Sequence, residues 1–269
     1  MGDSATFAVD NYFLHEGHDH TPNRDPYKIH RALTAASRSE VVDSLCRKLS
    51  LSKLNDRQET ESSLEDVLDT GYTFRGYGRY FTIQPMQVRE ELRELAVLLD
   101  EHAPESIVEI GTATGGTFYV LCRYLQTTDL IVSVDVPGGV PGDGMGGGYS
   151  TGRAEFMRSF ATDKRLEFVR QNSHSYDTVR QIENVLGDRD IDFLFIDGDH
   201  TYGGVKADFD LYKRVLADDA IVAVHDIKGP ETPYCEVSRF WDEIKERYRT
   251  REIVGRQEQT WAGIGIIYL

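Results

Sequence analysis

The sequence predicts an α/β fold built on a doubly wound, mostly parallel sheet. From Gln84 onward, short apolar runs typical of strands alternate with runs whose apolar residues recur at helical spacing. Because a helical pattern separates each strand-like run from the next, we expect helices on both faces of the sheet. Two strand-like runs close the chain around a short polar turn, which indicates an antiparallel pair at the edge of the sheet.

The expected elements follow one another in the order that such a sheet requires. A helix carrying Met86, Val88, Leu92, Leu95, Leu98 and Leu99 leads into the strand SIVEI at 106–110. Further strands are LIVSVD near 130, LEFVR near 167, IDFLFID near 194 and AIVAVHD near 223, with helices at about 116–126, 174–186 and 203–216. A last helix through Val237 and Tyr248 precedes the closing strands REIVG and AGIGIIYL.

The N-terminal part of the chain differs from the rest in composition. Residues 1–65 contain polar and Ser/Thr-rich runs, and we expect an irregular, partly disordered or helical extension before a main domain at 66–269. One apolar patch at helical spacing is expected to dock a short helix on the main body; it consists of Val41, Val42, Leu45, Leu49 and Leu51.

Length and composition exclude several classes of protein. The 269 residues, 40% of them hydrophobic, are enough for one large domain with a sizeable core. The mean hydropathy is -0.43, and no run approaches the roughly 20 apolar residues of a membrane helix. The start of the chain lacks the pattern of a secretory signal, and the three cysteines are too scattered for a disulfide framework. These features predict a cytoplasmic protein.

The charge balance limits the partners. A formal net charge of -15 argues against nucleic acid and anionic membranes, both of which attract clustered Lys and Arg. The acidity is rich in aspartate and poor in lysine, with 25 Asp, 20 Glu, 22 Arg and 8 Lys. A halophilic origin and a GC-rich genome both account for this pattern. Oligomeric state is left open, a homo-oligomer included.

The first candidate site lies where the strand at 106–110 turns into the next helix. It contains Glu109, Gly111, Thr112, Gly115 and Gly116. Gly111 and Gly115 are four residues apart, so the turn does not match the G-x-G-x-x-G dinucleotide pattern. The E-x-G-x-x-x-G spacing resembles the first motif of methyltransferases that use S-adenosylmethionine (SAM). A tight connection without ligand is the other interpretation.

Polar residues after the next two strands extend this candidate site. Asp135 stands 26 residues after Glu109, where a carboxylate is placed to accept hydrogen bonds from ribose hydroxyls. Asn172 and Ser173 follow the third strand and are candidates for contacts with adenine or ribose, although both residue types also cap helices. The Gly-rich segment between Val136 and Arg153 is either a flap over the site or a plain flexible loop.

The stretch FIDGDHTYGGV, at 195–205, carries the most specific resemblance. Combined with EIGTATGG at 109–116, it resembles the methyltransferase family that includes cephalosporin hydroxylase-like and sugar O-methyltransferases. The resemblance covers roughly residues 80–269. It implies SAM as cofactor and a Rossmann-like sheet of seven strands with the last strand antiparallel.

The same resemblance suggests a metal site. Metal-dependent O-methyltransferases of the catechol type hold a divalent cation, Mg²⁺ or Mn²⁺, at positions that match Asp197, His225 and Asp226. The position of their lysine base holds His200 here, and Asp199 is a candidate to orient that imidazole. His225 departs from the all-oxygen ligand set of that type. A strand-end histidine bonded to backbone and an aspartate that caps a helix are the structural alternatives.

These residues predict a SAM-dependent O-methyltransferase acting on a small hydroxylated molecule such as a sugar or a secondary metabolite. A metal-dependent oxygenase is the alternative, because His200, His225 and one of Asp197 or Asp226 would make a two-His, one-carboxylate iron site. A protein that binds SAM without turnover is a third hypothesis. The aromatic segment GYGRYFTIQPMQ, at 76–87, would line an acceptor pocket or pack the core.

Overall fold

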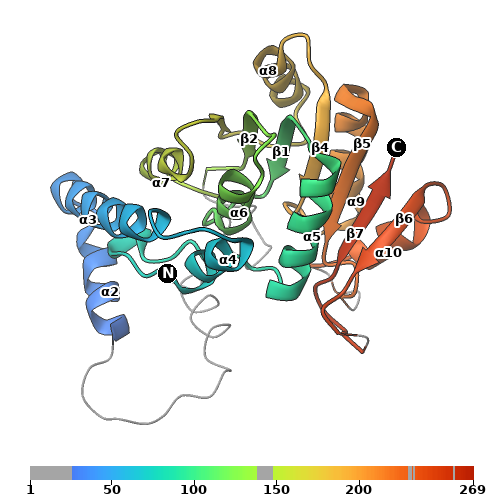
Figure 1. Cartoon of the computed structure of the whole chain (residues 1–269). Coiled ribbons are helices and arrows are strands. Elements are labelled where there is room, and N and C mark those ends of the chain that lie inside the picture. The colour runs from blue at the N-terminus through green and yellow to red at the C-terminus, as the bar shows by residue number, and fades with distance from the viewer. Residues whose placement is uncertain (1–25, 138–147, 230–231, 233, 257) are drawn as a thin grey trace.

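The computed structural model describes residues 26–137, 148–229, 232, 234–256 and 258–269. They form a seven-stranded sheet in the order β3-β2-β1-β4-β5-β7-β6 (Figure 1). The strands are β1 Ser106–Ile110, β2 Leu130–Val134, β3 Arg165–Val169, β4 Ile191–Ile196, β5 Leu216–His225, β6 Arg249–Ile253 and β7 Ile264–Tyr268. The predicted doubly wound fold is confirmed, and β7 runs antiparallel to both neighbours.

Helices cover both faces of the sheet. On one face α5 (Arg89–His102) and α6 (Gly116–Tyr124) lie against the sheet, and α4 (Leu64–Thr73) and α7 (Thr151–Met157) share the same hydrophobic core. The other face packs against α8 (Tyr176–Leu186), α9 (Tyr202–Tyr212) and α10 (Val237–Ile244). Successive strand residues point to opposite faces. In β1, for example, Ile107 belongs to the first core and Val108 to the second.

Helices also precede the sheet, namely α2 (Pro26–Ala36) and α3 (Glu40–Gln58), which extend beyond it on the side away from β6 (Figure 1). The predicted apolar patch on α3 does not form the packing face as a whole, because Val41, Leu45 and Leu49 are exposed. The buried face is instead that of Cys46, Ser50 and Leu54. The hydroxyl of Ser50 accepts a hydrogen bond from the backbone N–H of Tyr77 at 2.8 Å, which allows a polar residue on this face.

The strand order places a crevice above β1. The chain leaves β1 toward β2 on one side and returns to β4 on the other, so the loops at their carboxyl ends diverge, and ligands bind at such a point in open α/β sheets. Most of the Gly-rich segment after β2, residues 138–147, lies outside the described residues, so its role as a flap stays a prediction. None of the helices described is long and apolar enough to cross a membrane.

Candidate functional site

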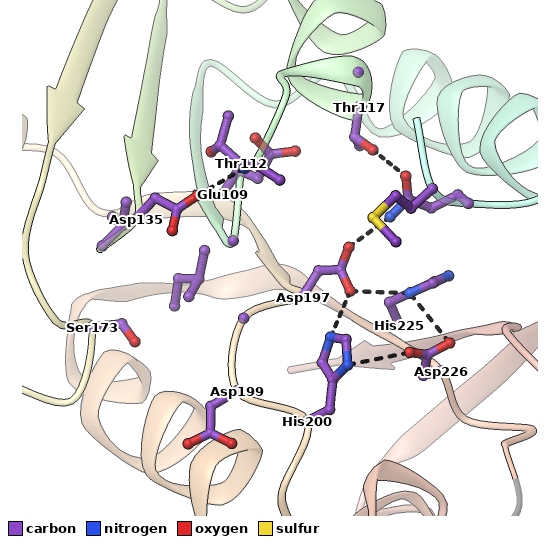
Figure 2. Close-up of a pocket in the computed structure, with 18 of the residues that line it drawn as sticks. Glu109, Thr112, Thr117, Asp135, Ser173, Asp197, Asp199, His200, His225 and Asp226 are labelled. Carbon is purple, nitrogen blue, oxygen red and sulfur yellow. Dashed lines mark hydrogen bonds and ion pairs between the residues drawn. The ribbon is translucent and has the colours of Figure 1, made fainter. Parts of the chain in front are cut away.

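A cavity of about 260 Å³ opens at the carboxyl ends of β1, β2, β3, β4 and β5. Every site residue predicted from the sequence lines it except Gly115. The structure therefore brings residues from five separate strand ends into one cavity. Figure 2 shows that the two ends of the cavity differ, with Asp135 and Ser173 at one end and His225 and Asp226 at the other.

Two buried carboxylates from β1 and β2 mark the first end. Glu109 is only 1% exposed, and its Oε2 has no hydrogen-bond partner among the described residues. Burial raises the pKa of Glu109 to about 8, against a hydrogen bond from Thr112 that lowers it. Asp135 accepts hydrogen bonds from the backbone N–H groups of Ala113 at 2.8 Å and Val136 at 2.7 Å. Burial nevertheless raises the pKa of Asp135 to about 6.

The turn after β3 completes this end of the cavity. The side-chain oxygen of Asn172 accepts a hydrogen bond from the backbone N–H of His174 at 2.9 Å, so it stabilises the turn itself. The cap of α8 is Ser175, whose hydroxyl accepts from the N–H of Asp177. Ser173 is buried at the cavity wall. Ser175 therefore caps α8, and the two candidate residues, Asn172 and Ser173, line the cavity.

Two carboxylates and two imidazoles meet at the second end, after β4 and β5. Asp197 Oδ1 lies 3.0 Å from His225 Nδ1 and 3.2 Å from His200 Nε2 (Figure 2). Asp226 lies 3.5 Å from His200 Nδ1 and 3.5 Å from His225 Nδ1. Asp197 therefore stands between the two imidazole rings, and each ring faces both carboxylates.

The pKa of Asp197 is lowered in this cluster, and the pKa values of His200 and His225 are raised. Burial opposes charge on Asp197, but His225 and His200 outweigh it and hold the pKa of this carboxyl well below its usual range. Burial likewise opposes charge on His225, yet the carboxylates of Asp197 and Asp226 raise its pKa to about 9. The pKa of His200 is raised in the same way. The charged forms of this cluster therefore stabilise one another.

Backbone conformation decides where the carboxylates of Asp226 and Asp199 point. Asp226 follows β5 with φ at 66°, a left-handed conformation that few residues other than glycine adopt and that is found at functional sites. It directs the carboxylate toward the two imidazoles (Figure 2). Asp199 points away from His200 and accepts a hydrogen bond from the N–H of Thr201, just before α9. Asp197 and Asp226, rather than Asp199, orient His200 in the structure.

The cluster fits a divalent cation. One ligand atom each from Asp197, His225 and Asp226 lie within 4.8 Å of one another. Two carboxylate oxygens and one imidazole nitrogen suit cations such as Mn²⁺ or Fe²⁺ better than Mg²⁺, which prefers oxygen. His225 Nε2 is buried without a hydrogen-bond partner among the described residues. Among the described residues, the polar contacts of this imidazole are therefore those of its Nδ1 with Asp197 and Asp226.

Comparison with known protein families identifies the domain that carries this site. Residues 108–227 match the family model described as a methyltransferase domain. The chain contains a methyltransferase domain. A protein of Sinorhizobium fredii, "Uncharacterized protein y4gI", is 28% identical over 141 residues, which is 52% of this chain but 15% of that protein. The chain thus spans only a small part of this relative's length.

Solved structures share the fold of the methyltransferase domain. An O-methyltransferase from Bacillus cereus in complex with SAH superposes with a TM-score of 0.53 at 18% identity, over 78% of this chain and 91% of that one. TomG from Streptomyces achromogenes, an O-methyltransferase in complex with SAM, gives 0.50 at 16% identity, over 78% and 90%. The predicted Rossmann-like methyltransferase fold is confirmed by these likenesses.

The glycines of the β1–α6 turn serve packing within the methyltransferase domain. Gly111 has φ at 90°, and a Cβ there would lie 2.0 Å from the carbonyl oxygen of Asp197. A Cβ on Gly116 would lie 2.3 Å from the nitrogen of Pro85. Both contacts are with other residues of this chain rather than with a ligand. The turn after β1 can approach the loop after β4 this closely only because Gly111 has no side chain.

Sequence patterns did not reveal Gln87, which links Asp197 to the first turn of α6. Its side-chain N–H donates to Asp197 Oδ2 at 2.6 Å, and its carbonyl oxygen accepts from the hydroxyl of Thr117 at 2.5 Å. Gln87 belongs to the aromatic segment at 76–87. This segment contributes to the core through Tyr80, which is fully buried, and Gln84 and Gln87 line the cavity.

Proposed function

We propose that the chain is a SAM-dependent O-methyltransferase that transfers a methyl group to a hydroxyl of a small molecule, with a divalent cation at the second end of the cavity. The observation that carries this proposal is the single cavity shared by the β1–α6 turn and the Asp197–His200–His225–Asp226 cluster. The methyltransferase domain match and the SAM- and SAH-bound O-methyltransferases of like fold support it.

The first end of the cavity would hold SAM, which supplies the electrophilic methyl group. Asp135 stands at the end of β2, where its carboxylate can accept hydrogen bonds from ribose hydroxyls. Glu109 lies buried beside it with an unpartnered oxygen. Ser173 and Asn172 form the wall after β3, which we assign to the adenine side.

The second end would bind and activate the acceptor. His200 lines the cavity and is held on both ring nitrogens, by Asp197 and by Asp226. In its neutral form this imidazole removes the proton of the acceptor hydroxyl as the oxygen attacks. Because methyl transfer is an in-line displacement, most of the remaining contribution comes from holding donor and acceptor in line.

Asp197, Asp226 and His225 would hold the cation. Held by these residues, the cation would supply Lewis acidity that makes the acceptor hydroxyl easier to deprotonate. The carboxylates also position His200, so they serve the base as well as the cation. We assign as acceptor a small molecule with a free hydroxyl, such as a sugar or a secondary metabolite.

Titration calorimetry with SAM tests the first end of the cavity. We expect the purified chain to bind SAM and Asp135→Ala to lose at least about tenfold in affinity, because a buried hydrogen-bonding partner of the ribose is removed. Asp129→Ala, at the exposed opposite end of β2, is the matched control and should bind as the unaltered chain does. Equal affinities of both variants would remove Asp135 from the site.

Methyl transfer from labelled SAM to a panel of hydroxylated metabolites tests the reaction itself. We expect turnover that EDTA abolishes and that Mn²⁺ or Mg²⁺ restores. The oxygenase hypothesis draws on the convergence of His200 and His225 on Asp197. Iron in protein purified without added metal, together with no affinity for SAM, would favour that hypothesis over methyl transfer.

A further inference from the structure

A second group of ligand atoms shares two residues with the cluster of Asp197, His200, His225 and Asp226. One ligand atom each from His200, Asp226 and Cys235 lie within 4.8 Å of one another. This group shares Asp226 with the Asp197–His225–Asp226 group but differs from it in containing a sulfur. All three side chains are partly exposed, so a cation can reach them from solvent.

The backbone fixes Cys235 in this place. The N–H of Glu236 donates to the carbonyl oxygen of His200 at 2.7 Å, which ties the residue after Cys235 to the imidazole's own backbone. Thr232 and Cys235 exchange backbone hydrogen bonds in an isolated bridge. The residue after Cys235 is therefore bonded to the backbone of His200, which holds the thiol close to His200 and Asp226.

Cys235 also differs from the other cysteines of the chain. Cys46 and Cys122 are buried, whereas Cys235 is partly exposed. Cys122 lies in α6, and Cys46 lies in α3. A reagent or cation in solution that binds a thiol will therefore meet Cys235 first.

We propose that His200, Asp226 and Cys235 form a site for a thiophilic divalent cation, of which Zn²⁺ is the best match, distinct from the cation site of Asp197, His225 and Asp226. One sulfur, one imidazole nitrogen and one carboxylate oxygen make the three-ligand set that zinc takes, with a fourth position left for water. Magnesium disfavours both sulfur and nitrogen. The thiol proton passes to solvent as the sulfur–metal bond forms.

Occupancy of this site has a chemical consequence for the proposed reaction. A cation bound to His200 uses the lone pair that would accept the proton of the acceptor hydroxyl. Asp226 would also bind this cation instead of the cation held with Asp197 and His225. The loaded site and base catalysis by His200 exclude each other, so Zn²⁺ should inhibit methyl transfer. This consequence rests on the proposed function, whereas the site itself does not.

Cobalt provides the direct test, because thiolate ligation gives Co²⁺ an intense charge-transfer band in the near ultraviolet. We expect the full chain to show this band and to saturate at one equivalent. Cys235→Ser should abolish the band and His200→Ala should weaken binding at least about tenfold. His174→Ala is the matched control, an imidazole of the same cavity outside both groups, and should keep the band.

Thiol reactivity gives a second readout. Zn²⁺ should slow the modification of Cys235 by a disulfide reagent at least about tenfold, and His200→Ala should remove most of this protection. No charge-transfer band in the unaltered chain, or a band that survives in Cys235→Ser, would overturn the site.

Activity measured on the same preparations separates the two proposals. A band and thiol protection without any methyl transfer would leave the site standing and reject the proposed function. Methyl transfer without a band would do the reverse. Where both hold, the Zn²⁺ concentration that halves activity should rise at least about tenfold in Cys235→Ser.

Discussion

The carboxylates at the two ends of the cavity are all largely removed from solvent but are differently paired. Among the residues that the structure describes, neither Glu109 nor Asp135 has a cationic partner at hydrogen-bond distance, and burial raises their pKa values to about 8 and about 6. Asp197 lies within 3.2 Å of two imidazoles, and its pKa is held well below its usual range. Burial alone therefore does not decide the charge of a carboxylate in this cavity.

The difference in pairing indicates which ligand each end of the cavity can accommodate. An unpaired buried carboxylate is costly, and the cost is relieved by a ligand that carries hydrogen-bond donors or positive charge. SAM carries both, so the first end is suited to it. At the second end the charges are already balanced within the chain. A cation there must compete with protons on His200 and His225, which makes its binding dependent on pH.

The largest effect should come from breaking the paired end. Asp197→Asn removes the partner shared by His200 and His225, so both the orientation of the base and the cation ligand are lost. We expect methyl transfer to fall on the order of 10³-fold, beyond the cost of losing a base alone. Steady-state kinetics with labelled SAM measure this. Asp219→Asn, on the exposed start of β5, is the control, and a loss of similar size there would contradict the assignment.

A smaller effect is expected when the imidazole alone is removed. His200→Ala should lower the rate on the order of 10²-fold, as removal of a general base does, while SAM affinity stays unchanged. The pH profile of the rate is the decisive measurement, because the limb that reports the base should disappear. His102→Ala, at the C-terminal end of α5, should behave as the unaltered chain does. An unchanged pH profile in His200→Ala would remove His200 from this role.

The unpaired end should show itself in the pH dependence of stability. The pKa of Glu109 is about 8 in the folded chain against 4.5 as its ordinary value, so folding favours its protonated form. Its contribution to stability is full below pH 4.5 and is lost as the pH rises to about 8.

Glu109→Gln should therefore become more stable than the unaltered chain as the pH rises through this window, by about 1.4 kcal/mol per pH unit. Denaturant unfolding of both proteins across the window measures the difference. Glu105→Gln, exposed before β1, is the matched control. Parallel curves for Glu109→Gln and the unaltered chain would show that Glu109 keeps its ordinary pKa.

The smallest effect concerns the surface rather than the cavity. A net charge of -15 should destabilise the chain at low ionic strength through repulsion, and added salt should screen it. We expect the melting temperature to rise by a few degrees between low and molar KCl. A neutral osmolyte at matched osmolality is the control. A flat or falling melting temperature would leave the base composition of the genome as the better explanation for the aspartate-rich surface.

The sheet could be predicted well from the sequence, because strands that are buried on both faces consist of nearly continuous apolar runs. The face of α3 was predicted poorly, since the buried face includes Ser50, whose burial depends on a backbone partner 27 positions away. Hydrophobicity alone favours Val41, Leu45 and Leu49, and these are exposed. A pattern based on apolar residues cannot register a polar residue that is satisfied by tertiary contact.

The candidate site shows the same limit. Strand ends were found because carboxylates and histidines follow apolar runs directly, and all of these residues line one cavity. Which of Asp197 and Asp199 faces His200 depends on the backbone between β4 and α9, and the sequence carries no signal for it. Gln87 lies in no motif, and its partner Asp197 is 110 positions away.

Gln87 has a consequence for how the two proposed ligands affect each other's affinity. It forms one hydrogen-bonded chain from Asp197, a proposed cation ligand, to Thr117, in the first turn of the helix that follows the proposed donor turn. Two ligands that act on one such chain are thermodynamically linked, and linkage is reciprocal. Whatever factor the cation contributes to the affinity for SAM, SAM must contribute to the affinity for the cation, whichever of the two arrives first.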